Sequence, residues 1–118
     1  MVKIMKIIIS ESFFKGDSKE FEDFIKTRYG KPLQKVFLRR LRNVDAAMNL
    51  CVLLQPGFPG DWHWLEGNRS HQLGANLSGG MRLVCQAEGD LKQYMDQSGG
   101  INCKLITVLI IIEIIDYH

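Results

Sequence analysis

A β-hairpin is predicted in the middle of the chain, over the residues Leu73-Gly74-Ala75-Asn76-Leu77-Ser78-Gly79-Gly80-Met81-Arg82-Leu83-Val84-Cys85. Apolar residues recur at every second position on both sides of the Ser78-Gly79-Gly80 turn, at Leu73, Ala75 and Leu77 before it and at Met81, Leu83 and Cys85 after it. This period of two is typical of strands that bury one face, and a glycine-rich turn between two such runs is typical of a hairpin. The spacing therefore predicts two paired antiparallel strands.

Two further strands are predicted at the ends of the chain. Val2 to Ser10 is a β-rich stretch, and Lys104 to Ile115 is the most apolar run in the sequence. The second run is expected to be a central strand, buried on both faces. Between the hairpin and this strand, Glu88 to Asn102 is polar and ends in Ser98-Gly99-Gly100, so it is expected to form a long loop of unknown use.

Two helices are predicted between the first strand and the hairpin. Asp17 and Glu20 have the spacing of a capping box, and Gly30 is a plausible helix stop. Pro32 then fits the first turn of a second helix. Along this second helix an apolar stripe is formed by Leu33, Val36, Phe37, Leu41, Val44 and Met48. A different face of the same helix carries Lys35, Arg39 and Arg42.

The predicted order is β-α-α-β-β-β, in one domain that spans residues 1–118. This is an α+β fold: a twisted, mostly antiparallel sheet with a helical hairpin packed on one face. A length of 118 residues with 46% hydrophobic content is enough for a single core. The first strand is not followed by a glycine-rich phosphate loop, so a nucleotide-binding fold is not supported.

The composition favours a cytoplasmic protein. Cys51, Cys85 and Cys103 are an odd number without CxxC spacing, which predicts reduced thiols instead of a disulfide framework or a zinc knuckle. Lys3 and Lys6 interrupt the first apolar stretch, so no signal peptide is expected. The last apolar run is shorter than the roughly 20 residues that span a bilayer and contains a carboxylate, so membrane insertion is not expected.

The charge of the chain is unevenly distributed. Residues 1–50 hold eleven Lys and Arg against six Asp and Glu, a net of +5, whereas residues 51–118 hold four against seven, a net of −3. The basic half predicts contact with a polyanion or an acidic partner.

Three motifs resemble the HigB branch of the RelE-type toxin superfamily. They are His63-x-Leu65-x-Gly67-x-Arg69 after a Pro-Gly loop, Ser78-Gly79-Gly80-Met81-Arg82-Leu83-Val84, and the ending Glu113-Ile114-Ile115-Asp116-Tyr117-His118. The resemblance covers the whole chain in element order, but in specific residues only from about Trp62 onward. It implies a RelE-like, microbial-RNase-like fold and a toxin that cleaves messenger RNA, commonly on the ribosome.

The resemblance also implies a set of functional residues and partners. The catalytic residues carried over are His63, Arg82, Asp116, Tyr117 and His118. The implied partner is a small HigA-like helix-turn-helix antitoxin, through which alone the toxin would meet operator DNA. No cofactor and no metal is implied.

The residue types suit metal-free RNA cleavage, which needs a base for the ribose 2′-OH and an acid for the leaving 5′ oxygen. Imidazole titrates near neutrality and can do either, so His118 and His63 are the leading proton carriers. The guanidinium of Arg82 matches phosphate oxygens. Asp116 would orient an imidazole or contact RNA, and Tyr117 would donate a proton or stack on a base.

Contact with RNA is further predicted for Arg69, His71, Lys35, Arg39 and Arg42. Each has a simpler interpretation. The three helix cations are equally a solvated face or a contact for ribosomal RNA or an antitoxin, and His71, expected in a strand, is equally a structural or rim-exposed residue. His63 is equally a packing partner of Trp62 and Trp64, and Arg82 is equally an ion-pair partner of Glu113.

One departure from the family pattern is Glu66, which stands where a lysine is common. A carboxylate there would repel a phosphate, unless Arg69 faces the cleft and supplies the cation. Two other functions therefore stay open: a ParE-like toxin directed at DNA gyrase, and a non-catalytic module that docks an antitoxin.

Overall fold

The structure is a computed structural model that describes residues 4–69 and 71–116. Its strands are β1 (Lys6–Ile9), β2 (His63–Trp64), β3 (Leu73–Asn76), β4 (Met81–Ala87) and β5 (Val108–Asp116). Its α-helices are α1 (Ser18–Tyr29), α2 (Lys31–Ala46) and α3 (Leu50–Leu53). Four 3₁₀ turns connect them: η1 (Gly67–Arg69), η2 (Ser78–Gly80), η3 (Leu91–Tyr94) and η4 (Cys103–Leu105).

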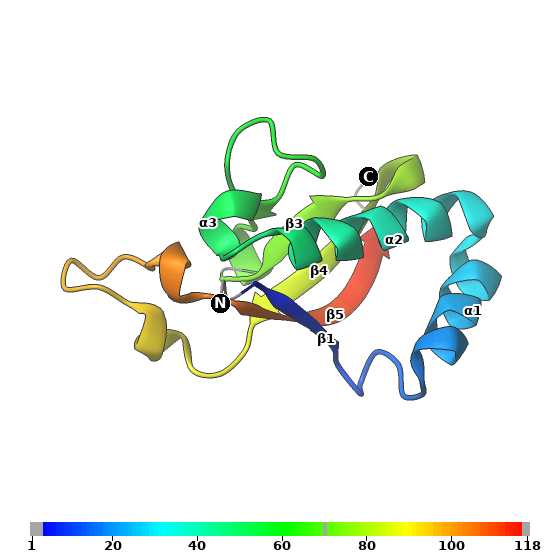
Figure 1. Cartoon of the computed structure of the whole chain (residues 1–118), viewed down its shortest axis with the longest axis horizontal. Helices are drawn as coiled ribbons and strands as arrows, with labels where there is room; N and C mark the ends of the chain where they lie inside the picture. The colour runs from blue at the N-terminus through cyan, green and yellow to red at the C-terminus, as the bar shows by residue number, and fades with distance from the viewer. Residues whose placement is uncertain (1–3, 70, 117–118) are drawn as a thin grey trace.

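The strands form one sheet in the order β1-β5-β4-β3-β2. β1 runs parallel to β5, and every other neighbouring pair is antiparallel. The predicted α+β class with a mostly antiparallel sheet is confirmed. The expected central position of the last strand is also confirmed, since β5 pairs with β4 on one side and with β1 on the other (Figure 1).

The start and end of α1 and the start of α2 lie where the sequence predicts. The Asp17 side chain accepts from the backbone N–H of Glu20, whose own side chain accepts from the N–H of Asp17. Gly30 ends α1 with φ +94°, a conformation that favours glycine, and Pro32 stands in the first turn of α2. In the part of the chain that the structure describes, no helix has the length and apolar character to cross a membrane.

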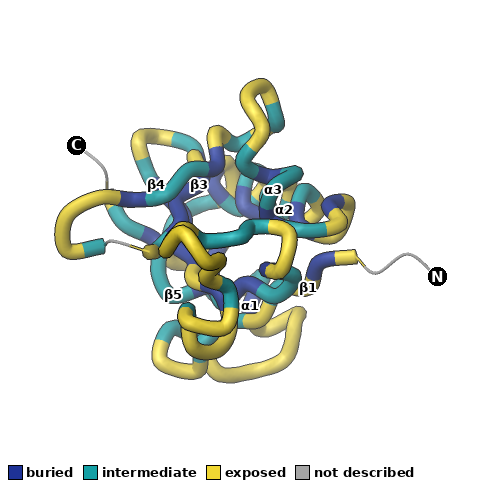
Figure 2. The backbone as a smooth tube through the Cα atoms, turned by 90° about the vertical axis from the view of Figure 1, so that its left-hand side faces the viewer, coloured by how far each residue is buried: buried dark blue, intermediate teal, exposed yellow. Residues whose placement is uncertain are grey.

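The helices cover one face of the sheet and enclose the main core there (Figures 1 and 2). Phe21 and Ile25 of α1 and Leu33, Phe37 and Val44 of α2 are buried against the sheet. The sheet contributes buried side chains at alternate positions, Leu73 and Ala75 on β3, Leu83, Cys85 and Ala87 on β4, and Leu109 and Ile111 on β5. The predicted stripe is wrong at Met48, which is 54% exposed because α2 already ends at Ala46.

Three stretches differ from the prediction. The helix α3 and the short edge strand β2 are additional to the predicted β-α-α-β-β-β order, and the last strand begins at Val108 instead of Lys104. The delay arises because the Asn102 side chain accepts from the N–H of Lys104 and caps η4. Residues 88–102 form an exposed loop, drawn mostly yellow in Figure 2, with a local bridge between Met95 and Ile101.

The expectation that all cysteines are reduced is wrong for two of them. Cys51 on α3 and Cys103 in η4 form a disulfide, with their Cα atoms 5.0 Å apart. The fold brings them together because the backbone N–H of Leu50 donates to the carbonyl of Ile106. Cys85 remains a thiol in the core, where burial raises its pKa above the ordinary range.

We expect this disulfide to stabilise the fold by about 2–4 kcal/mol, because it closes a loop across a sequence separation of 52 residues. The Cys51→Ser/Cys103→Ser variant should lose that amount in urea unfolding, compared with the oxidised wild type. Wild type treated with a thiol reductant is the matched control and should unfold like the variant. Equal unfolding midpoints for oxidised and reduced wild type would contradict the prediction.

Candidate functional site

The sheet has a second face, opposite the one on which α1 and α2 pack, and we call it the helix-free face. On β4 this helix-free face carries Arg82, Val84 and Gln86, since side chains alternate along a strand and Leu83 and Cys85 point into the helical core. Gly74 of β3 is the register partner of Val84, and Glu113 of β5 lies opposite the same residue. Arg69, which lies between β2 and β3, also reaches this face, because it pairs with Glu113.

A β-bulge decides which residues of β5 reach the helix-free face. Cys85 pairs with Ile111, but the preceding residue, Val84, pairs with Glu113, so Ile112 is an extra residue on β5. The extra residue reverses the alternation beyond it. Glu113 is thereby placed on the helix-free face, and Ile114 packs with the buried core.

Arg82 lies on this face with only 9% of its surface exposed. Its side chain extends over Gly74: a Cβ on that glycine would lie 2.7 Å from Cδ of Arg82 and 2.8 Å from Cδ2 of Leu65. The missing side chain on β3 thus gives the arginine room to cross toward β2. Beside the hairpin turn, Arg82 also lines a hollow with Asn76, Leu77, Gly80 and Met81.

His63 lies on β2 and is the register partner of the same Gly74. Its Nδ1 is 2.7 Å from the carbonyl oxygen of Asp61. Because a carbonyl only accepts, Nδ1 carries the proton in the neutral ring, which leaves the lone pair on Nε2. The imidazole ring is half-exposed. Its contact with the backbone fixes the ring and leaves Nε2 as the atom that can accept a proton. Sequence reasoning singled out neither Gly74 nor Asp61, although both contact predicted site residues.

We expect Gly74→Ala to displace the Arg82 side chain, because the new methyl group would overlap it. Overpacking of this kind costs about 1–3 kcal/mol of unfolding free energy. Urea unfolding gives the stability change, and chemical shifts of the guanidinium group give the displacement. Gly100→Ala is the control, since a Cβ there meets nothing nearer than 3.5 Å. Unchanged guanidinium shifts in Gly74→Ala would contradict the prediction.

Arg69 forms a separate polar cluster on the helix-free face. It pairs with Glu113 through Nη2 and donates from Nη1 to Oε1 of Gln72 at 3.1 Å. The alternative interpretation of Arg82, an ion pair with Glu113, is therefore wrong, because Glu113 pairs with Arg69. Because this guanidinium is engaged by a carboxylate and an amide, it does not supply a free cation in place of the lysine that Glu66 replaces. Glu66 itself is exposed.

We expect Glu113→Gln to release Arg69 at little cost to the fold. Both side chains are more than a third exposed, 37% and 38%, so the pair contributes only about 0–1 kcal/mol. The variant should bind single-stranded RNA more tightly than wild type, because one negative charge is removed and one cation is freed. Fluorescence anisotropy at several salt concentrations measures this. Glu88→Gln, which removes an exposed carboxylate from the 88–102 loop, is the control, and equal affinity of Glu113→Gln and wild type would contradict the prediction.

The C-terminal site residues are described only as far as Asp116. Asp116 pairs with Met81, the neighbour of Arg82, so β5 ends beside the hairpin turn. By alternation Asp116 and Arg82 occupy opposite faces at this register, and Ile115 is the direct partner of Arg82. Tyr117 and His118 lie outside the described residues.

The sequence predicts His71 in a strand, and this is wrong, because β3 begins at Leu73. His71 stands in the turn before β3 with φ +71°, a left-handed conformation that is uncommon for a residue other than glycine. It is exposed and lines a hollow with Gln72, Gln86 and Leu91. It shares no described contact with Arg82 or His63.

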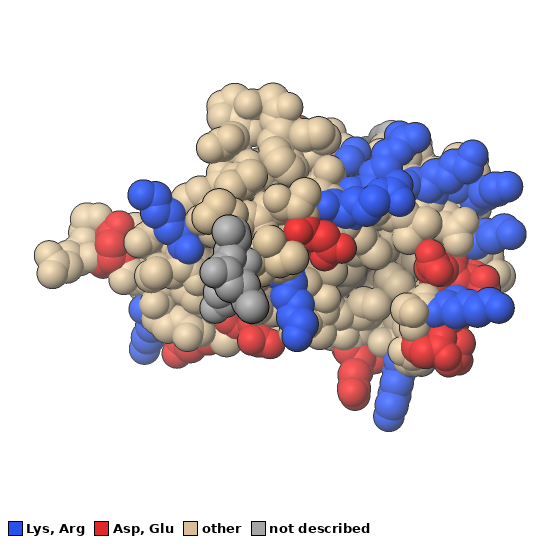
Figure 3. All heavy atoms as spheres, in the orientation of Figure 1, with Lys and Arg blue, Asp and Glu red and all other residues tan. Residues whose placement is uncertain are grey.

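The basic face of α2 lies on the other side of the molecule. Lys35, Arg39 and Arg42 are exposed, and Lys and Arg side chains gather over α2 in Figure 3. Since α2 covers the opposite face of the sheet, these cations do not join Arg82. Arg40 does connect the two layers, because its Nε donates to the carbonyl of Asn76 at 2.7 Å. Burial and the neighbouring charge of Arg39 lower its pKa.

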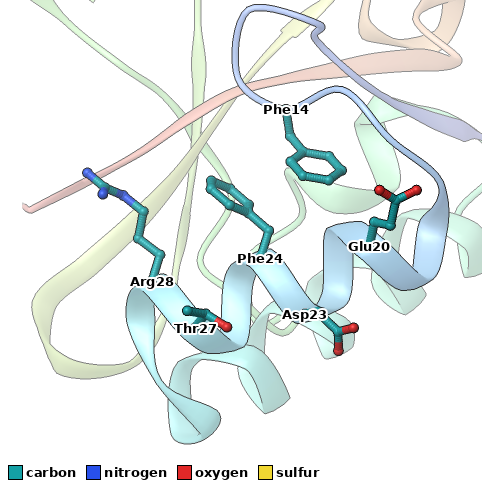
Figure 4. Close-up of a pocket in the computed structure, with 6 residues that line it drawn as sticks. All are labelled: Phe14, Glu20, Asp23, Phe24, Thr27 and Arg28. Atoms are coloured by element: carbon teal, nitrogen blue, oxygen red, sulfur yellow. The ribbon is translucent and has the colours of Figure 1, made fainter.

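A further hollow lies along α1, lined by Phe14, Glu20, Asp23, Phe24, Thr27 and Arg28 (Figure 4). Two of these side chains are carboxylates, which would repel a phosphate, and none is a predicted site residue. Among residues 4–69 and 71–116, no cluster of three His, Cys, Asp or Glu side chains suited to a metal ion was found. The candidate site is therefore the helix-free face around Arg82 and His63.

Comparison with known proteins gives a match in structure and none in sequence. No protein-family model and no curated protein matches the chain. A solved structure, the YoeB/ParE toxin from Agrobacterium tumefaciens, is similar over 97% of this chain and 99% of its own, with a TM-score of 0.54 and 14% sequence identity. At this identity the likeness shows a shared fold.

Proposed function

We propose that this protein is the toxin of a toxin–antitoxin pair and an endoribonuclease that cleaves messenger RNA. The single observation that supports this most is the position of Arg82. A nearly buried arginine extends across a glycine on the helix-free face, next to the strand that carries His63. The similar fold of a YoeB/ParE toxin supports the toxin assignment.

In the proposed reaction the ribose 2′-oxygen attacks the adjacent phosphorus, and the bond to the 5′ oxygen breaks. Nε2 of His63 accepts the 2′-OH proton, since Nδ1 is bound to the carbonyl of Asp61. Arg82 donates to the phosphate oxygens on which charge accumulates. His118 protonates the leaving 5′ oxygen, and Tyr117 orients it or the RNA. Asp116, on the opposite face of the sheet from Arg82, would orient His118 from the end of β5 and would not contact the RNA beside Arg82. The reaction needs no cofactor or metal in this proposal.

The proposed partners follow from the same assignment. The RNA is cut on the ribosome, and the basic face of α2 contacts ribosomal RNA or the antitoxin. We propose a HigA-like helix-turn-helix antitoxin as the natural inhibitor, with operator DNA bound only through it. The proposed place of action is the cytoplasm, because the ribosome is there; the cysteines do not support this compartment, since Cys51 and Cys103 form a disulfide.

A ParE-like toxin directed at DNA gyrase is the second candidate. The similar solved structure is a toxin that bears both names, YoeB and ParE, so the fold is compatible with either. The nuclease is favoured because His63 presents a half-exposed imidazole on β2, next to β3, whose Gly74 lies under the side chain that Arg82 extends from β4.

Primer extension on messenger RNA translated in a cell-free system tests the proposal. Wild type should produce discrete cuts. His63→Ala and His118→Ala should each slow cutting by about 10²-fold or more, the usual contribution of a general acid or base. Arg82→Ala should have an effect of about 10²–10³-fold.

The control for charge removal is Lys104→Ala, which removes an exposed cation outside the proposed site. Circular dichroism checks that Arg82→Ala is folded, and Arg82→Lys provides a milder change if it is not. Inhibition of translation without RNA cuts would contradict the nuclease proposal and favour a protein that acts by binding alone. Inhibition of gyrase supercoiling would favour the ParE-like candidate.

A further inference from the structure

A second hollow opens on the helix-free face at the opposite end of β4 from Arg82. It is lined by His71, Gln72, Gln86, Asp90 and Leu91, with Ala87 and Gly89, and its volume is about 400 Å³. The volume falls in the range of small-ligand sites, so one planar ring system fits it. None of the predicted catalytic residues lines it, and no lysine or arginine is among the lining residues.

The lining residues combine polar groups with flat and apolar surface. Gln72 and Gln86 contribute side-chain amides, His71 an exposed imidazole ring, and Leu91 a half-buried apolar side chain. The one formal charge is the carboxylate of Asp90, whose Oδ1 already accepts from the N–H of Lys92. A phosphate would be repelled there, whereas a neutral ring with polar edges would be accepted.

The Arg69 pair fixes which way the Gln72 amide points. A guanidinium can only donate, so the atom of Gln72 that meets Nη1 of Arg69 is the oxygen. The NH₂ group of Gln72 is consequently the part left to donate to a ligand. Leu73 is the register partner of Cys85, so Gln72, the residue before β3, lies beside Gln86 of β4.

The hollow also lies in line with the proposed cleavage site. Arg82 and Gln86 share one face of β4, and four residues of strand span about 13 Å. Glu113 is the register partner of Val84, so the Arg69–Glu113 pair stands between the two positions. An RNA strand with a phosphate at Arg82 would place the base of a neighbouring nucleotide, not the scissile one, near Gln86.

We propose that this hollow is a nucleobase subsite for single-stranded RNA, and that it favours a purine. The inference rests on the proposed function and adds the specificity of the same face. The NH₂ group of Gln72 donates to the purine N7, the Gln86 amide meets the neighbouring edge group, and the base stacks against the His71 ring. The subsite chooses where along a message the enzyme cuts, and it takes no part in bond breaking.

Fluorescence anisotropy with short, labelled homopolymeric ribo-oligonucleotides of each base tests the subsite apart from catalysis. Wild type should bind the purine probes more tightly than the pyrimidine probes. Gln86→Ala should reduce this preference by about tenfold, the discrimination expected for one bidentate contact to a base edge. His71→Gly should reduce it as well, and glycine keeps the left-handed turn without strain. Gln97→Ala, in the exposed turn of the 88–102 loop, is the matched control and should change nothing.

Cleavage maps of the same variants separate this inference from the proposed function. If RNA is cut and both variants keep the wild-type base preference in binding and in cut sites, the subsite is wrong and the nuclease stands. If no RNA is cut but the variants lose the purine preference in binding, the nuclease is wrong and the subsite stands. Equal binding of all probes by wild type overturns the subsite regardless of cleavage.

Discussion

The arrangement of the whole molecule depends on β5, which is hydrogen-bonded to a strand on each side. Its pairing with β1 and β4 joins β1 to the antiparallel strands, and its apolar side chains meet the helices on one face. The bulge at Ile112 then shifts the register by one residue. Without that shift Glu113 would point into the helical core, where a carboxylate is costly, and Ile114 would be lost from it. The bulge thus keeps the core apolar and brings a charge to the other face.

The helix-free face carries three charged side chains, Arg82, Arg69 and Glu113. Arg82 is almost buried, and Gly74 is the reason that it fits, because any side chain on that residue would occupy the space of the guanidinium stem. Next to it, Arg69 and Glu113 neutralise each other, and their ion pair connects η1 to β5. The face therefore offers its cation at one end and neutral polar groups at the other, an arrangement that suits a ligand with both phosphates and bases.

The basic side of α2 is a distinct surface. The sheet lies between it and Arg82, so a polyanion bound to Lys35, Arg39 and Arg42 leaves the helix-free face open. Arg40 is the structural link between the two layers through the carbonyl of Asn76. The fold therefore presents a cationic surface on its helices and a separate polar surface on its sheet.

The sequence by itself determined the features that depend on local pattern. The capping box at Asp17, the stop at Gly30 and the hairpin turn all lie where short-range spacing predicts them, because each is decided by residues within one turn of each other. The tertiary structure alone decided which distant residues meet. The Cys51–Cys103 disulfide, the partner of Glu113 and the place of Arg82 over Gly74 depend on strand register, and a one-residue bulge is enough to reverse them. No periodicity in the sequence marks that extra residue, since Ile112 is as apolar as its neighbours.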